Sequence, residues 1–149
     1  MLAQNKITVM THNKTEQISL PRTLINQLLT HAQSGNGDEV CGFIASVSGE
    51  PIKTYPVPNI ATPANKRFEM EPSAQIDAIK IMREQDEEIF AIYHSHPTSA
   101  AAPSQTDIAE FNYPGALCVI ISLNIQGVLE IRAYRIIKNQ VFEASIEAT

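Results

Sequence analysis

The chain has 149 residues, the length of one domain that can bury a continuous core. Its apolar fraction of 44% and charged fraction of 18% are typical of a globular protein, and its net charge of −5 argues against broad electrostatic attraction to nucleic acid or membrane. No stretch has the roughly 18 to 20 uninterrupted apolar residues of a membrane span. Met1–Met10 lacks the apolar core of a secretory signal.

The two cysteines, Cys41 and Cys118, both lie in apolar runs. Two are too few for a disulfide scaffold, and buried thiols fit a reducing compartment. We therefore expect a cytoplasmic protein of one domain, residues 1–149, in which both thiols are small core residues.

The first part of the chain predicts strands around an amphipathic helix. Short strands are expected at Lys6–Thr11 and Glu16–Leu20. Pro21–Gln33 has helical apolar spacing, with proline in the first turn and Ser34–Gly37 ending the helix. The apolar run Val40–Val47 is typical of a strand buried on both faces.

The middle of the chain predicts an edge strand and a second helix. Two prolines in Ile52–Pro58 favour a sheet edge. Asn65–Phe68 is interpreted as an ordinary polar loop rather than a groove wall, and Arg67–Glu71 as a short strand. The second helix is Pro72–Gln85, with these side chains expected to point inward: Ile76, Ile79, and Ile81 or Met82.

The remaining elements complete a mixed domain. They are a strand at Glu88–His94, a helix at Ser104–Asn112, and strands at Ala116–Leu123, Val128–Ile137 and Val141–Ser145. Mixed strands with flanking helices indicate the α/β or α+β class.

Two histidines stand where the strand Glu88–His94 ends. Because strand side chains alternate, His94 and His96 point to one face, close enough to bind one ion. Asp107 follows after a loop and is the natural third ligand. Two imidazoles, one carboxylate and an open fourth position describe a catalytic zinc rather than a structural one. Without this context the histidines would also fit a hydrogen-bonded polar pair.

Hydrolysis at zinc also needs a proton carrier that is not a ligand. Glu39, directly before the apolar run, is our candidate, although a lone carboxylate there is usually a solvated strand end. Ser104 and Asp107 also fit the cap and third positions of a helix start. Capping and a role at the metal are compatible, because a rigid helix start can hold Asp107 toward the ion.

The spacing of these residues resembles the signature of the JAMM (MPN+) metalloisopeptidases. Glu39 is followed by His94-Ser95-His96, then after seven residues by Ser104, and after two more by Asp107. The resemblance spans about residues 18–146. It implies the MPN fold, a curved mixed sheet flanked by helices and similar to that of cytidine deaminases.

The resemblance also implies a role for each motif residue. His94, His96 and Asp107 are expected to bind one Zn²⁺ per chain, although the general order of metal affinities also admits cobalt or nickel. Glu39 is expected to act as the general acid/base, and Ser104 to donate to the oxyanion of the tetrahedral intermediate.

Compact bacterial members of this family are similar to hydrolases of sulfur-carrier proteins. The expected reaction is hydrolysis of a peptide or isopeptide bond after the Gly-Gly tail of a ubiquitin-like or sulfur-carrier protein. Such a tail fits a narrow groove because it has no Cβ atoms. The carrier and the leaving amine (cysteine, lysine or another) stay open, and no nucleic acid or membrane partner is expected.

Other readings of the sequence compete with this one. A non-catalytic MPN scaffold would bind partner proteins, but such members usually lose the metal ligands. A DNA-repair relative is disfavoured by the acidic charge, and Cys41 as a nucleophile by its apolar surroundings. Residues 1–17 lie outside the resemblance, and pairing with a sheet edge, mediating a homodimer or lying over the cleft are all open to them.

Overall fold

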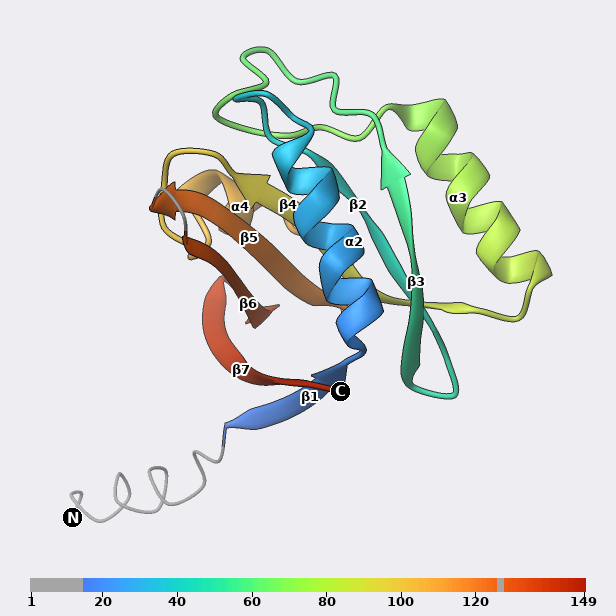
Figure 1. Ribbon diagram of the computed structural model, residues 1–149. Helices are drawn as coiled ribbons and strands as arrows, with labels where there is room; N and C mark the ends of the chain where they lie inside the picture. The colour runs from blue at the N-terminus through green and yellow to red at the C-terminus, as the bar shows by residue number, and fades with distance from the viewer. Residues whose placement is uncertain (1–14, 126–127) are drawn as a thin grey trace, which may run out of the picture.

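The protein is described by a computed structural model that covers residues 15–125 and 128–149. Its strands form a seven-stranded curved sheet in the order β1-β7-β6-β5-β4-β2-β3 (Figure 1). The strands are β1 (Glu16–Leu20), β2 (Cys41–Val47), β3 (Glu50–Val57), β4 (Glu88–His96), β5 (Leu117–Ile125), β6 (Val128–Ile137) and β7 (Gln140–Ala148). The helices are α2 (Arg22–Gln33), α3 (Pro72–Glu84) and α4 (Gln105–Glu110).

The sheet is mixed, and β4 lies inside it. β4 pairs antiparallel with β2 and parallel with β5, so its backbone is hydrogen-bonded on both sides. At its carboxyl end, His94 lies opposite Cys41 of β2 and Ile120 of β5. The two histidines therefore stand at the end of an interior strand of the sheet.

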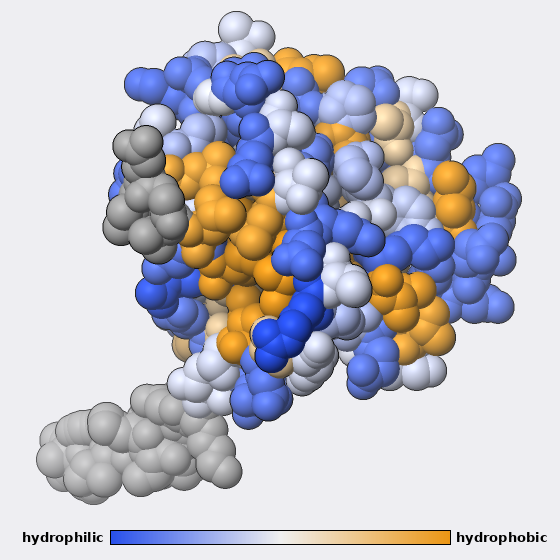
Figure 2. Space-filling view, viewed as in Figure 1, coloured by the Kyte–Doolittle hydropathy of each residue, from blue (hydrophilic) through white to orange (hydrophobic). Residues whose placement is uncertain are grey.

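The helices divide between the two faces of the sheet. α2 packs on one face, against a core that includes Ala91 and Tyr93, whereas Ile92 belongs to the core beneath α3. The alternation of side chains along β4 consequently sends His94 and His96 to the face of α3. On the α2 face, apolar side chains gather beside the helix (Figure 2).

Within the described residues, no helix is long and apolar enough to cross a membrane.

Most predicted elements are confirmed. The strand expected at Val40–Val47 is buried on both faces over six of the seven residues of β2, and β3 is an edge strand. Met82 is buried and Ile79 packs against the core, both as expected. The strand expected at Lys6–Thr11 lies outside the described residues.

Two expectations about the middle of the chain are wrong. Arg67–Glu71 forms no strand, because its contact with the preceding segment is a single bridge between Asn59 and Met70. Ile76 does not point inward and is 64% exposed, whereas of the alternatives Ile81 and Met82 it is Met82 that is buried, with Ile81 45% exposed. α3 buries only a narrow stripe of one face against the sheet, so helical apolar spacing alone overestimated its buried set.

Candidate metal centre

The two histidines lie at the end of β4 with their side chains almost fully buried. The exposed fractions of the His94 and His96 side chains are 1% and 4%. The His96 ring donates from Nδ1 to the carbonyl oxygen of Ala100 at 2.7 Å, since a carbonyl can only accept. In the neutral ring this fixes the tautomer, and Nε2 carries a free lone pair.

Asp107 is held in place by the start of α4. Ser104 caps the helix: its Oγ accepts from the Asp107 backbone N–H at 2.9 Å, and its own backbone N–H donates to Asp107 Oδ2 at 2.9 Å. This reciprocal pair is a capping box, as the sequence predicted. Its geometry also leaves the hydroxyl hydrogen of Ser104 free to donate elsewhere.

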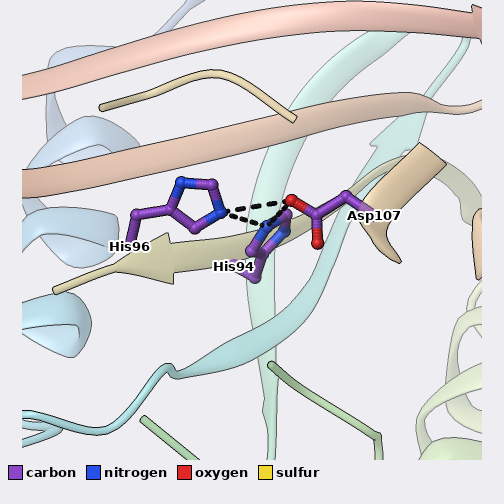
Figure 3. Close-up of side chains that lie close together, drawn as sticks. All are labelled: His94, His96 and Asp107. Carbon is purple, nitrogen blue, oxygen red and sulfur yellow. Dashed lines mark hydrogen bonds and ion pairs between the residues drawn. The ribbon is translucent and has the colours of Figure 1, made fainter. Parts of the chain in front are cut away.

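The three predicted ligands converge on one point (Figure 3). Asp107 Oδ2 lies 3.0 Å from His94 Nε2 and 3.1 Å from His96 Nε2, and the two nitrogens are 3.1 Å apart. Zinc bonds of about 2.0 to 2.1 Å at tetrahedral angles would separate ligand atoms by about 3.3 Å. The spacing of the three atoms is therefore close to what a zinc ion requires.

The chemistry of the three atoms also fits a cation. The lone pair on His96 Nε2 faces the carboxylate oxygen of Asp107, which cannot donate while it is ionised. Burial would raise the Asp107 pKa, but the interactions with the His94 and His96 rings and the hydrogen bond from the Ser104 backbone outweigh burial and hold that pKa well below its ordinary value. A permanently ionised carboxylate and two imidazole nitrogens form a donor set that suits zinc.

Glu39 lies two residues before β2, on the same face of the sheet as the two histidines. Continuing the pairing of β2 with β4 past Cys41 places Glu39 opposite His96. Glu39 is 5% exposed, and its Oε1 has no hydrogen-bond partner among the described residues. The alternative of a solvated strand end is thus wrong.

The environment of Glu39 changes its acidity. Burial raises the pKa of its carboxyl to about 7, and the negative charge of Asp107 also raises it while His96 lowers it. The charges of two of the three converging residues therefore act on the Glu39 carboxyl. A carboxyl group with a pKa near neutrality can both accept and release a proton at physiological pH.

Cys41 lies beside Glu39 but does not have the properties of a nucleophile. Its side chain is fully buried, and its thiol donates to the Val57 carbonyl oxygen at 3.3 Å. Burial raises the pKa of the thiol to about 12, with a further contribution from the charge of Glu39. The thiol therefore stays protonated at neutral pH.

An apolar cavity of about 290 Å³ opens beside the triad, between the loop after β3 and helix α4. His94 and Asp107 contribute to its wall together with Phe68, Met70, Phe111 and Tyr113. The Phe68 ring also stacks on the His94 ring, with centroids 4.5 Å apart and an angle of 25° between the planes. The interpretation of Asn65–Phe68 as an ordinary loop is therefore wrong for Phe68.

Sequence reasoning missed several residues that support the site. Phe68 stacks on the His94 ring, and the carbonyl oxygen of Ala100 orients the His96 ring. Ser95, which lies between the two histidines in the sequence, accepts a hydrogen bond from the Val40 backbone. An aromatic residue within a polar loop was the available signal for Phe68. A backbone carbonyl leaves no signal in the sequence.

Solved structures show which class of fold carries this site. The solution structure of protein DSY2949 from Desulfitobacterium hafniense matches with a TM-score of 0.80 and 28% identity, covering 89% of this chain and 93% of that one. The crystal structure of AF2198, a JAB1/MPN domain protein from Archaeoglobus fulgidus, matches with a TM-score of 0.58 and 18% identity, covering 87% and 98%. The chain has the JAB/MPN fold, as the resemblance predicted.

Sequence comparisons then give the family. The model described as prokaryotic homologs of the JAB domain matches residues 21–137, and the chain belongs to this family. It is 31% identical over 125 residues to the CysO-cysteine peptidase of Mycobacterium tuberculosis, covering 83% of this chain and 85% of that protein. It is also 31% identical over 114 residues to the desampylase of Haloferax volcanii, covering 72% and 82%.

Proposed function

We propose that this chain is a zinc-dependent metallopeptidase that hydrolyses a peptide or isopeptide bond after the C-terminal Gly-Gly of a ubiquitin-like or sulfur-carrier protein. The observation that carries the proposal is the convergence of His94, His96 and Asp107 beside a buried Glu39 that is not one of the three. The relative named CysO-cysteine peptidase, at 31% identity, supports a carrier protein joined to cysteine as substrate.

In this proposal His94, His96 and Asp107 would hold the ion. Zinc supplies a Lewis acid and lowers the pKa of a water molecule to about 7. Glu39 accepts a proton from the attacking water and delivers it to the leaving amine, a role that suits its pKa of about 7. Ser104 donates its hydroxyl hydrogen to the oxyanion, while its lone pair stays engaged with the backbone of Asp107.

The cavity next to the three converging residues is consistent with a substrate that binds through an extended tail. It borders His94 and Asp107 but neither Glu39 nor Ser104, so it lies to one side of the reacting groups. Glycine residues suit the part of the tail next to the ion, because a tail without Cβ atoms needs the least room. The apolar wall then accommodates the part of the tail that precedes the glycines.

Cleavage followed by intact mass tests the proposal. The substrates are the Gly-Gly-tailed carrier proteins of the source organism, each joined through its terminal carbonyl to cysteine or to a lysine side chain. Zinc-loaded wild-type protein should release the amine, and Glu39→Gln should lower kcat by about 10²- to 10⁴-fold while it retains zinc. Glu39→Asp is the matched control that keeps the carboxylate but withdraws it by one methylene.

Each outcome has a defined meaning. Release of cysteine alone supports a role in sulfur metabolism, and release of lysine alone supports a deconjugating isopeptidase. If protein with stoichiometric zinc cleaves no substrate but still binds carriers, the alternative of a non-catalytic scaffold replaces the proposal.

A further inference from the structure

The loop between β3 and α3, residues 58–71, is closed by backbone hydrogen bonds and filled by one side chain. At its neck, Ile60 donates to the Glu69 carbonyl oxygen at 2.9 Å and Glu71 donates to that of Pro58 at 3.0 Å. Inside the neck, the Asn59 side chain makes five hydrogen-bond contacts, all with backbone groups. A single amide thus connects backbone groups from both sides of the loop.

The surrounding groups fix the orientation of this amide. Asn59 Oδ1 accepts from the N–H groups of Ala61 and Glu69, each at 2.9 Å. Asn59 Nδ2 faces the carbonyl oxygens of Glu39 at 2.9 Å and Arg67 at 3.1 Å, with a third carbonyl at 3.3 Å. Rotating the amide by 180° would set donors against donors and acceptors against acceptors, so only one orientation is compatible with the site.

Glu39 is bound to this loop through both of its backbone groups. Beyond Cys41, the pairing of β2 with β3 places Glu39 opposite Asn59. Its carbonyl accepts from the Asn59 side chain where a regular ladder would supply a backbone N–H, and its own N–H donates to Ala64 at 2.8 Å. The loop therefore replaces the sheet as the support of Glu39.

On its other side, the chain next to Glu39 is tied to β4. The Val40 N–H donates to Ser95 Oγ at 2.9 Å, and the Ser95 N–H donates to the Val40 carbonyl at 3.0 Å. Ser95 is fully buried and stands between the two histidines in the sequence. Val40 is thus held by the strand that carries the triad, and Glu39 by Asn59 and its loop.

We propose that Asn59 is a positioning residue that aims the Glu39 carboxyl at the metal triad. Its amide holds the Glu39 carbonyl, and the same amide orders the loop that brings Phe68 against the His94 ring. Asn59 touches no reacting atom in this arrangement and acts through Glu39. The predicted kinetic effect rests on the proposed function, whereas the structural effect does not.

The sharpest variant is Asn59→Asp, which keeps the shape and the accepting oxygen but replaces the donor with an oxygen that faces three carbonyls. It should lower kcat by about 10- to 100-fold, while KM and zinc stoichiometry stay near wild type. Asn65→Asp is the control, because it adds the same charge to an exposed position of the same loop and should leave kcat within twofold of wild type. An unchanged kcat in Asn59→Asp would overturn the proposal.

A double-mutant cycle separates positioning of Glu39 from a general structural role. In a Glu39→Gln background, Asn59→Asp should lower the residual kcat by less than about threefold, because the group that it positions is already disabled. A second full decrease of 10- to 100-fold would mean that Asn59 acts independently of Glu39, and the proposal would fail.

Amide hydrogen exchange tests the inference without relying on activity. In zinc-loaded Asn59→Asp, the Glu39 amide should exchange at least about tenfold faster than in wild type, and those of His94 and His96 should not change. Unchanged exchange at Glu39 would overturn the proposal. If wild type cleaves no carrier but exchange at Glu39 still accelerates, only the proposed function fails. Should Asn59→Asp not fold, the uncharged Asn59→Ser variant gives the same test with the same expected results.

Discussion

The start of α4 and the segment before β2 each bring a buried carboxyl group close to the same two histidines. The pKa of one carboxyl group is lowered and that of the other is raised. Asp107 receives a backbone N–H at 2.9 Å and lies within 3.1 Å of both ring nitrogens, and its pKa is held well below the ordinary value. Glu39 Oε1 has no partner among the described residues, and burial raises its pKa to about 7. Both side chains are buried, so the difference in pKa comes from the polar groups around them: these keep Asp107 ionised, whereas Glu39 can gain and lose a proton near neutral pH.

Removal of Asp107 should have the largest effect on this pair. Asp107→Ala takes away the only anionic ligand of the triad, so zinc should be lost and activity should fall by at least about 10³-fold, since the ion contributes several kcal/mol to the transition state. Metal analysis of the purified variant, together with circular dichroism to verify the fold, provides the measurement. Stoichiometric zinc in a folded Asp107→Ala protein would contradict the assignment of this ligand.

Ser104→Ala tests whether the start of α4 does more than hold Asp107. Loss of the hydroxyl should lower kcat by about 10²- to 10³-fold through the oxyanion. It should also lower the free energy of unfolding by about 0.5 to 2 kcal/mol through the lost cap. Ser104→Thr keeps both interactions and should recover most of each. A variant that loses stability but keeps kcat would restrict Ser104 to capping.

The stability of the metal-free protein should respond to pH in opposite ways at the two carboxylates. The raised pKa of Glu39 stabilises the fold below the ordinary value of 4.5, and this contribution is lost as the pH rises through about 7. The lowered pKa of Asp107 contributes stability at neutral pH that is lost as the pH falls below 3.8.

Urea denaturation of metal-free Glu39→Gln measures the first of these contributions. Relative to wild type, the free energy of unfolding should rise by up to about 3 kcal/mol at a pH of about 8, and the gain should vanish near pH 4.5. A gain of equal size at both pH values would mean that packing, rather than ionisation, distinguishes the two side chains.

The smallest expected effect concerns the thiol next to Glu39. Cys41 and Cys118 are 0% and 3% exposed, and burial raises the pKa of each thiol to about 12. Iodoacetamide at a pH of about 8 should therefore modify neither residue in the folded protein and leave activity unchanged. Both should react in urea, which is the control. Rapid alkylation of Cys41 with loss of activity would revive a cysteine nucleophile.

The predictable part of the molecule is the part with a regular period or a fixed spacing. Alternation along β4 placed His94 and His96 on one face, and the motif spacing found Asp107 and Glu39. The support around them was not predictable. Asn59 binds backbone groups, including the Glu39 carbonyl, from an irregular loop. Neither hydrophobic periodicity nor residue type predicts such a contact in a loop.

The wrong prediction for Ile76 in α3 has a similar physical origin. Apolar spacing marks which side of a helix prefers burial, but the width of the buried stripe depends on the neighbouring strands. α3 contacts β3 and β4, and the neighbours cover Ala78 and Met82 while Ile76 and Ile81 stay exposed. Tertiary packing therefore decided positions that the sequence pattern left ambiguous.

Helix α4 has six residues, fewer than a free peptide needs to hold a helical conformation in water. The free-energy cost of nucleating this short helix is offset by the capping box and by the contacts of Asp107 with the His94 and His96 rings. The helix and the centre that it serves thus form one cooperative unit, since loss of either removes a support of the other. Release of the proposed ion should then loosen residues 104–110, and a probe placed there would report whether the site is occupied.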